Sequence, residues 1–169
     1  MGVPLFKELR RAYGFDDVAI VPGEVTINPD MAKTEFSIGD YLFNLPVLAS
    51  AMDGVVSPSF ANLMSDMGGL GVLNLEGIHA RYEDPYSVLE EIIAAPQVEA
   101  TGLLQRVYSE PVKEELIGKC VHQVKKSGAV CAGSFTPQNT KRFSPLAVEA
   151  GADIIVVQST VTTARHMSR

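Results

Sequence analysis

The stretch LPVLASAMDGV, residues 45–55, marks a change in the pattern of this 169-residue chain. It opens with a continuous apolar run about as long as a buried strand, and a stretch with apolar residues at helical spacing follows at residues 59–67. A continuous run, in place of an alternating one, is typical of a strand that is covered on both faces. Residues 45–67 therefore predict one strand-and-helix unit of a buried parallel sheet.

The same pairing recurs along the rest of the chain. Further apolar runs lie at residues 69–74, 129–133 and 152–158, and helix-like stretches lie at residues 85–95, 113–127 and 146–150. Parallel neighbours cannot be joined by a tight turn, so this alternation predicts parallel strands with crossover helices. Before the first unit we expect a short helix over residues 3–14, an extended piece at residues 16–23 and a small hairpin at residues 35–43.

Two architectures fit this order of elements. A doubly wound open sheet normally has a Gly-rich turn after its first strand, and the sequence MDGVV at residues 52–56 does not match it. We therefore expect an α/β fold of the (β/α)8 or TIM-barrel type, which needs roughly 200 to 250 residues or more. Half a barrel would leave strand edges and an apolar face uncovered, so we expect this chain to be the first half of a longer protein.

Composition narrows the functional classes. The net charge is −6, which gives no surplus of basic groups for a nucleic acid, and no apolar segment reaches the roughly 20 residues of a membrane span. Two cysteines are too few for a disulfide framework, and we expect a cytoplasmic protein without a secretory signal. The three histidines are far apart in the sequence, and two of them lie beside basic residues, so we expect no metal site and solvent-facing positions for them.

Four segments carry a resemblance to a known family. Residues 45–55 resemble the first barrel strand and loop of the inosine monophosphate dehydrogenase and guanosine monophosphate reductase family. The other matching segments, in order, are FDDVAIVPG at residues 15–23, MGGLGVLN at residues 67–74 and GADIIVVQS at residues 151–159. Their order and spacing make the resemblance fairly specific.

The resemblance implies a domain organisation. Dehydrogenases of the family usually carry two regulatory CBS modules after the second strand, and residues 76–109 are too few to hold them. The chain is most similar to the short, CBS-less bacterial subgroup related to IMP dehydrogenase. We expect one barrel domain, with an N-terminal helix and hairpin over residues 1–44 and four βα units, the last incomplete, over residues 45–169. The resemblance also implies a homotetramer.

The resemblance also implies which residues bind ligands. Ser50 and Met52 would contact a purine nucleoside monophosphate, Ser50 at the ribose-phosphate end and Met52 against the base. Gln158, Ser159 and Thr160 would line the side of the cleft that binds NAD. This is the carboxyl edge of the strands, where active sites of barrels assemble.

The chain departs from the family pattern at the reactive positions. Gln158 stands where most of the dehydrogenases have a carboxylate, and Asn74 stands where histidine is common. The nucleophilic cysteine of the family lies on a Gly-Pro-Gly-rich loop that residues 1–169 do not contain, so we expect it beyond residue 169 and assign no catalytic residue here. Cys120 and Cys131 are expected in the core. Asp53 could orient a ligand or cap the helix that follows it.

The function implied by the resemblance is oxidation of inosine 5'-monophosphate (IMP) to xanthosine 5'-monophosphate (XMP) with NAD, in guanine nucleotide biosynthesis. A monovalent cation such as K+ would be bound by residues outside this chain. Three alternatives remain open at this stage. They are reduction of guanosine monophosphate (GMP) with NADPH, a non-catalytic barrel that binds purine nucleotides, and an unrelated flavin barrel.

Overall fold

The structure, a computed structural model, describes residues 11–158 of the chain. The chain divides into two compact units, residues 1–33 and residues 34–169.

The first unit contains two 3-10 turns, η1 (Phe15–Asp17) and η2 (Pro29–Met31). The prediction of an extended segment over residues 16–23 is wrong at residues 16 and 17, which belong to η1. The side chain of Asp17 accepts a hydrogen bond from the Gly14 N–H at 2.9 Å and closes this turn. The helix expected over residues 3–14 is absent from residues 11–14, and its remainder lies outside the described residues.

The second unit begins with the expected hairpin. Strands β1 (Phe36–Ile38) and β2 (Tyr41–Phe43) pair antiparallel, and Gly39 has a φ of 58° in the turn between them. A positive φ is accessible to glycine without steric cost, which explains the short connection. The rings of Phe36 and Phe43, directly opposite in the register, stack at 5.0 Å and present an apolar side to the sheet that follows.

The four predicted strands form one parallel sheet in the order β3-β4-β5-β6. Their bounds are β3 Leu48–Ala49, β4 Leu70–Asn74, β5 Ala132–Phe135 and β6 Ile154–Val157. Each strand lies beside its predecessor in the chain, without the reversal of order that defines a doubly wound sheet. This topology confirms the part of a (β/α)8 barrel that the sequence predicts.

Alternate side chains of the strands enter two separate cores. Val72 and Ile154 pack in a cluster with the hairpin residue Phe43, whereas their neighbours Leu73 and Ile155 pack against the helices. This period of two is what a strand buried on both faces requires. The hairpin thus covers one face of the sheet, the inner face, and helices cover the opposite, outer face.

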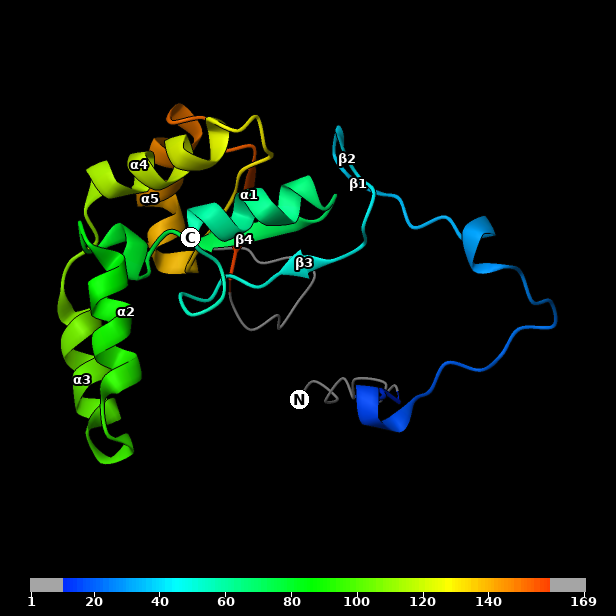
Figure 1. Cartoon of the computed structure of the whole chain (residues 1–169), viewed down its shortest axis with the longest axis horizontal. Coiled ribbons are helices and arrows are strands. Elements are labelled where there is room, and N and C mark those ends of the chain that lie inside the picture. The colour runs from blue at the N-terminus through cyan, green and yellow to red at the C-terminus, as the bar shows by residue number, and fades with distance from the viewer. Residues whose placement is uncertain (1–10, 159–169) are drawn as a thin grey trace, which may run out of the picture. The chain divides into compact units, whose positions relative to one another are not determined.

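The outer layer consists of three helices that contact the sheet or one another (Figure 1). They are α1 (Pro58–Asp66), α4 (Glu114–Lys125) and α5 (Pro137–Glu149). Their existence is confirmed, but α5 begins nine residues before the expected position, because Pro137 can open a helix at its first turn. Strand β3 is shorter than expected, and β5 starts at residue 132 instead of 129.

Helix α3 (Gln97–Ser109) was not predicted from the sequence. It forms an antiparallel pair with α2 (Pro85–Ala94), and the pair projects from the rest of the second unit (Figure 1). Helix α2 has no buried residue, and the buried residue of α3 is Val107. Without a clear apolar face, the helical period of α3 is weak in the sequence.

Asp153 connects several elements at the amino end of the sheet, just before β6. Its carboxylate accepts hydrogen bonds from Lys125 Nζ at 2.7 Å, from the Cys131 N–H at 2.7 Å and from the Tyr41 hydroxyl at 3.1 Å. Burial alone would raise the pKa of Asp153, but Lys125 and the other donors outweigh burial and lower it. The cluster therefore stabilises the fold above the ordinary pKa of aspartate, and that stabilisation is lost as the pH falls through the lowered value.

No helix among the described residues is long and apolar enough to cross a membrane.

The close packing of β4 on α1 leads to a prediction at Gly71. A Cβ there would lie 2.8 Å from the Cα of Ala61 on α1. We expect Gly71→Ala to lower the free energy of unfolding of the intact protein by about 1–3 kcal/mol, because the helix must move away from the strand. Urea unfolding would measure the change.

Gly102→Ala is the matched control. A Cβ at Gly102 on α3 meets no atom within 4 Å, and alanine is the better helix former, so stability should be unchanged or higher. Equal losses in both variants would contradict this account of Gly71.

Candidate functional site

The carboxyl ends of the four parallel strands meet at one edge of the sheet and define the candidate site. Ser50 and Met52 follow β3 there, and Gln158 follows β6. Ser50 and Gln158 are exposed, and 52% of Met52 is exposed, so all three are accessible to a ligand. Ser159 and Thr160, also expected at this edge, lie outside the described residues.

A polar layer closes the inner face at this edge. Asn74 and Ser134 are paired in the register of β4 and β5. Each lies two residues after a strand residue that packs in the inner core, so both lie on the inner face of the sheet. The Ser134 hydroxyl donates a hydrogen bond to Oε1 of Gln158 at 3.0 Å. Because the Gln158 N–H also donates to the Phe135 carbonyl at 2.8 Å, the side chain of Gln158 projects from a fixed backbone.

Asp53 is a buried carboxylate beside Met52. It is only 9% exposed, and its Oδ2 accepts a hydrogen bond from the Tyr108 hydroxyl at 2.5 Å and a longer one from Asn74 Nδ2 at 3.4 Å. Oδ1 has no hydrogen-bond partner among residues 11–158. The predicted alternative, that Asp53 caps the next helix, is wrong, because the Ser57 hydroxyl accepts from the Phe60 N–H and caps α1.

Gly77 provides the space that Asp53 occupies. A Cβ on Gly77 would lie 1.9 Å from Asp53 Oδ1 and 2.4 Å from its Cγ, well inside van der Waals contact. The backbone of Gly77, with a φ of −87°, is one that other residues adopt freely. Glycine is needed here because of the neighbouring carboxylate and not because of backbone conformation.

Tyr108 reaches Asp53 from the end of α3. Burial raises the pKa of Tyr108, and the hydrogen bond to Asp53 adds to the shift, so the phenol stays protonated and can donate at any physiological pH. The guanidinium of Arg81 lies 5.7 Å from the ring centroid of Tyr108 and donates to the carbonyls of Tyr108 and Glu76 at 3.0 and 2.8 Å. Arg81 thus ties α3 to the loop that follows β4.

Glu76 is a second buried carboxylate at the same edge. It accepts hydrogen bonds from the Thr136 N–H, from the Thr136 hydroxyl at 3.2 Å and from Asn139 Nδ2. These donors lie at the amino end of α5, where the helix dipole favours a negative charge. Glu76 therefore fixes the loop after β4 against the loop after β5.

A family model described as the IMP dehydrogenase / GMP reductase domain matches residues 12–169. The chain belongs to this family of oxidoreductases. The chain also resembles the crystal structure of an IMP dehydrogenase/GMP reductase-like protein from Corynebacterium glutamicum. That likeness has a TM-score of 0.86 and 34% identity, over 98% of this chain and 45% of the other.

Curated relatives agree with this assignment to the IMP dehydrogenase/GMP reductase family. An uncharacterized oxidoreductase of Mycolicibacterium smegmatis is 35% identical over 167 residues, which are 96% of this chain and 44% of the relative. The IMP dehydrogenase of Korarchaeum cryptofilum is 36% identical over 63 residues, which are 37% of this chain and 13% of that enzyme. The chain thus spans less than half the length of these relatives.

Both cysteines of the chain are core residues, as predicted. Cys120 and Cys131 are buried, and burial raises their pKa values to about 11 and about 12. The Cys120 thiol donates to the carbonyl of His79 at 3.4 Å. Lys119 and Lys125 lower the pKa values of Cys120 and Cys131 respectively, but burial outweighs them, so neither thiol has the lowered pKa that makes a cysteine reactive.

The expectation that the histidines face solvent is wrong for His79. It is 7% exposed, its ring makes an edge-to-face contact with Tyr86 at 5.7 Å, and burial lowers its pKa. The neighbouring Arg81 had suggested an exposed segment, but its guanidinium bonds to backbone carbonyls. His122 is exposed as expected, and His166 lies outside the described residues. Within residues 11–158, no group of three or more His, Cys, Asp and Glu side chains is placed to hold a metal.

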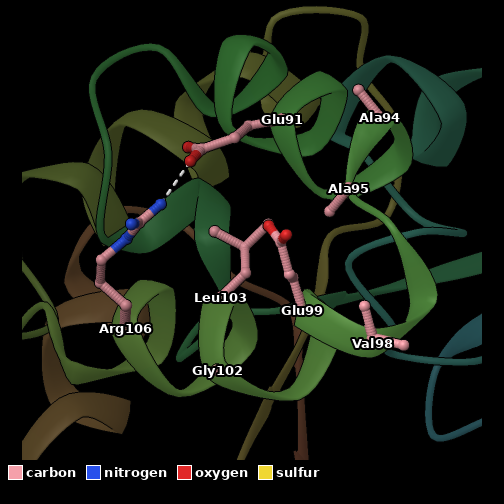
Figure 2. Close-up of a pocket in the computed structure, with 8 residues that line it drawn as sticks. All are labelled: Glu91, Ala94, Ala95, Val98, Glu99, Gly102, Leu103 and Arg106. Carbon is pink, nitrogen blue, oxygen red and sulfur yellow. Dashed lines mark hydrogen bonds and ion pairs between the residues drawn. The ribbon is translucent and has the colours of Figure 1, made fainter.

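A groove of about 600 Å³ lies on the α2–α3 pair, away from the strand ends (Figure 2). The ion pair of Glu91 and Arg106 spans it, and both side chains are more than half exposed. Its lining includes none of the strand-end residues, so the groove is not part of the candidate site.

Gly77 and Asp53 generate a prediction about rescue. We expect Gly77→Ala to lower the free energy of unfolding of the intact protein by about 1–3 kcal/mol, because the new methyl group overlaps the carboxylate. Adding Asp53→Ala removes the overlapping atoms, so the double variant should be more stable than the sum of the single effects predicts. Denaturant unfolding of the four proteins would measure the coupling, and strict additivity would contradict it.

The raised thiol pKa values predict low reactivity. Because the thiolate is the reactive form, iodoacetamide near neutral pH should leave Cys120 and Cys131 unmodified in the folded intact protein, with modification increasing only as the pH approaches 11. Peptide mass spectrometry would identify the modified sites, and alkylation in denaturant is the positive control. Rapid labelling of either cysteine in the folded protein would show that it is not a core residue.

Proposed function

We propose that the intact protein is an NAD-dependent IMP dehydrogenase that converts IMP to XMP. One observation carries the proposal: in a chain of this family, Ser50, Met52 and Gln158 lie exposed at the same carboxyl edge of a parallel sheet. Ligand sites of barrels assemble at that edge, where loops from several strands converge.

The overall reaction consumes IMP, NAD+ and water and produces XMP, NADH and a proton. A cysteine thiolate adds to C2 of the purine, the C2 hydrogen leaves as hydride with its electron pair, and water then displaces the sulfur to give the C2 oxygen of XMP. We propose that this cysteine lies beyond residue 169, together with the residues that activate the water and bind a monovalent cation such as K+.

This half of the barrel would bind the nucleotide. The hydroxyl of Ser50 is exposed and can donate to the phosphate or ribose of IMP, and the thioether of Met52 can pack on the flat face of hypoxanthine. Neither group takes part in bond making, so they orient the base for the thiolate. Such positioning accounts for a large part of catalytic rate enhancement.

NAD would accept the hydride, and the residues after β6 fit its polar groups. The amide of Gln158 is exposed and steadied by Ser134, so it can hydrogen-bond a ribose hydroxyl or carboxamide without charge. We propose that Ser159 and Thr160 also contact NAD, as the resemblance to the family implies.

The proposed domain is one barrel, with residues 1–44 before it and no CBS modules. The stretch between β4 and β5 supports this, because the helices α2, α3 and α4 occupy it. The remaining strands of the barrel would continue the sheet from β6 and pair with its exposed side. The proposed assembly is a homotetramer.

Reduction of GMP with NADPH is the second candidate. The absence of CBS modules between β4 and β5 favours it, because the reductases also lack them. The neutral Gln158, at a position where most of the dehydrogenases have a carboxylate, favours a third candidate instead. A barrel that only binds purine nucleotides is the third possibility.

The test is turnover by the intact protein. We expect NADH formation with IMP and NAD, and Ser50→Ala should raise KM for IMP roughly 10- to 100-fold, the effect of losing a hydrogen bond to a charged group. Ser87→Ala on the exposed face of α2 is the control and should leave KM unchanged.

Two further measurements on the intact protein have outcomes that would replace the proposal. Ammonia release from GMP with NADPH, without oxidation of IMP, would assign the protein as a reductase. Calorimetric binding of nucleotide with no turnover of either substrate would assign a binding barrel.

A further inference from the structure

The turn that carries Met52 is attached to the sheet at both of its ends. β3 precedes it, and Val56, which is 1% exposed, anchors its far end in the outer core. Between these points the turn is closed locally, by hydrogen bonds from the N–H groups of Val55 and Val56 to the Met52 carbonyl at 2.9 Å. Local closure fixes the shape of the turn but not its tilt against neighbouring elements.

Asp53 supplies the contact that sets this tilt. Its carboxylate is the acceptor for the Tyr108 hydroxyl at 2.5 Å, and Tyr108 lies 55 residues further along the chain, at the end of α3. The close approach of Gly77 on the other side leaves the carboxylate no room to move toward the loop after β4. Asp53 is therefore held between α3 and that loop.

Tyr108 is itself held in place. Arg81 lies over its ring and donates to its carbonyl, and the Tyr82 hydroxyl donates to the Val107 carbonyl at 2.9 Å. The end of α3 is thus fixed from the segment that follows η3 (Ile78–Ala80). The contacts form a continuous path from the α2–α3 pair to the residue adjacent to Met52.

We propose that Tyr108 is a positioning residue for the nucleotide: through Asp53 it sets where Ser50 and Met52 lie, so the α2–α3 pair controls nucleotide affinity without touching the nucleotide. This inference rests on the proposed function for its substrate. A displacement of about 1 Å in a group that positions a substrate can cost a factor of up to about 100, so the loss of one remote hydroxyl should be measurable.

The test compares Tyr108→Phe with Tyr82→Phe in the intact protein. Both variants lose one hydroxyl that donates a hydrogen bond at the same turn of α3, but only the first loses the contact to Asp53. We expect Tyr108→Phe to weaken IMP binding in calorimetry by about 10-fold, within the loss that a displaced positioning group can cause. Tyr82→Phe should bind IMP within about 2-fold of the parent. Both variants should melt below the parent, and Tyr108→Phe further below it, because it removes a donor from the buried Asp53 carboxylate.

A second measurement needs no ligand. Hydrogen exchange of the free protein should be faster at the amides of Val55 and Val56 in Tyr108→Phe and unchanged in Tyr82→Phe. If the parent binds neither IMP nor GMP, the proposed function fails, and the exchange data still decide whether Tyr108 positions the turn.

Two results would overturn the inference. One is unchanged exchange at residues 55–56 in Tyr108→Phe. The other is an equal loss of IMP affinity in both variants, which would mean that any loosening of α3 has the same effect.

Discussion

The fold depends on the need to cover both faces of a short parallel sheet. Its strands carry apolar side chains on each side, so neither face can be left to water. Helices α1, α4 and α5 cover the outer face, and the β1–β2 hairpin packs on the inner face around Phe43 and Val72. Since the strand interiors are committed to packing, polar groups can gather only at the strand ends. The position of the candidate site follows from this.

At the carboxyl edge, two kinds of polar residue have different tasks. Asp53 and Glu76 are buried carboxylates whose partners are neutral hydroxyl, amide and backbone donors from other loops. Such contacts fix loops against one another, because a buried carboxylate that loses its donors is costly. Ser50 and Met52 are exposed on the loop that Asp53 fixes, and Gln158 is held by Ser134 and the Phe135 carbonyl. Buried contacts therefore set the positions of the accessible residues.

The order of strands and helices could be predicted from the sequence, because a continuous apolar run indicates a buried strand whatever its tertiary neighbours are. It did not predict α3, whose apolar residues do not gather on one face, nor the full length of α5. Ser50 and Met52 could be placed at a strand end from local pattern alone. The role of Asp53 could not be decided, because its partner Tyr108 is distant in the chain and belongs to the helix that the pattern did not indicate.

His79 shows the same limitation in another way. A charged neighbour suggested exposure, yet Arg81 is used for backbone carbonyls at the end of α3, and the segment between them is buried. Local charge indicates solvent only when the charged group has no internal acceptor, and that condition is visible only in three dimensions.

The Asp153 cluster lies at the end of the sheet opposite to the accessible residues, where it joins the hairpin, α4 and β5. Cohesion and ligand contact are thus assigned to different ends of the same strands. Related proteins with this arrangement can therefore differ in the residues at the ligand end, and so in the reaction they catalyse. The contacts at the opposite end preserve the stability of the fold.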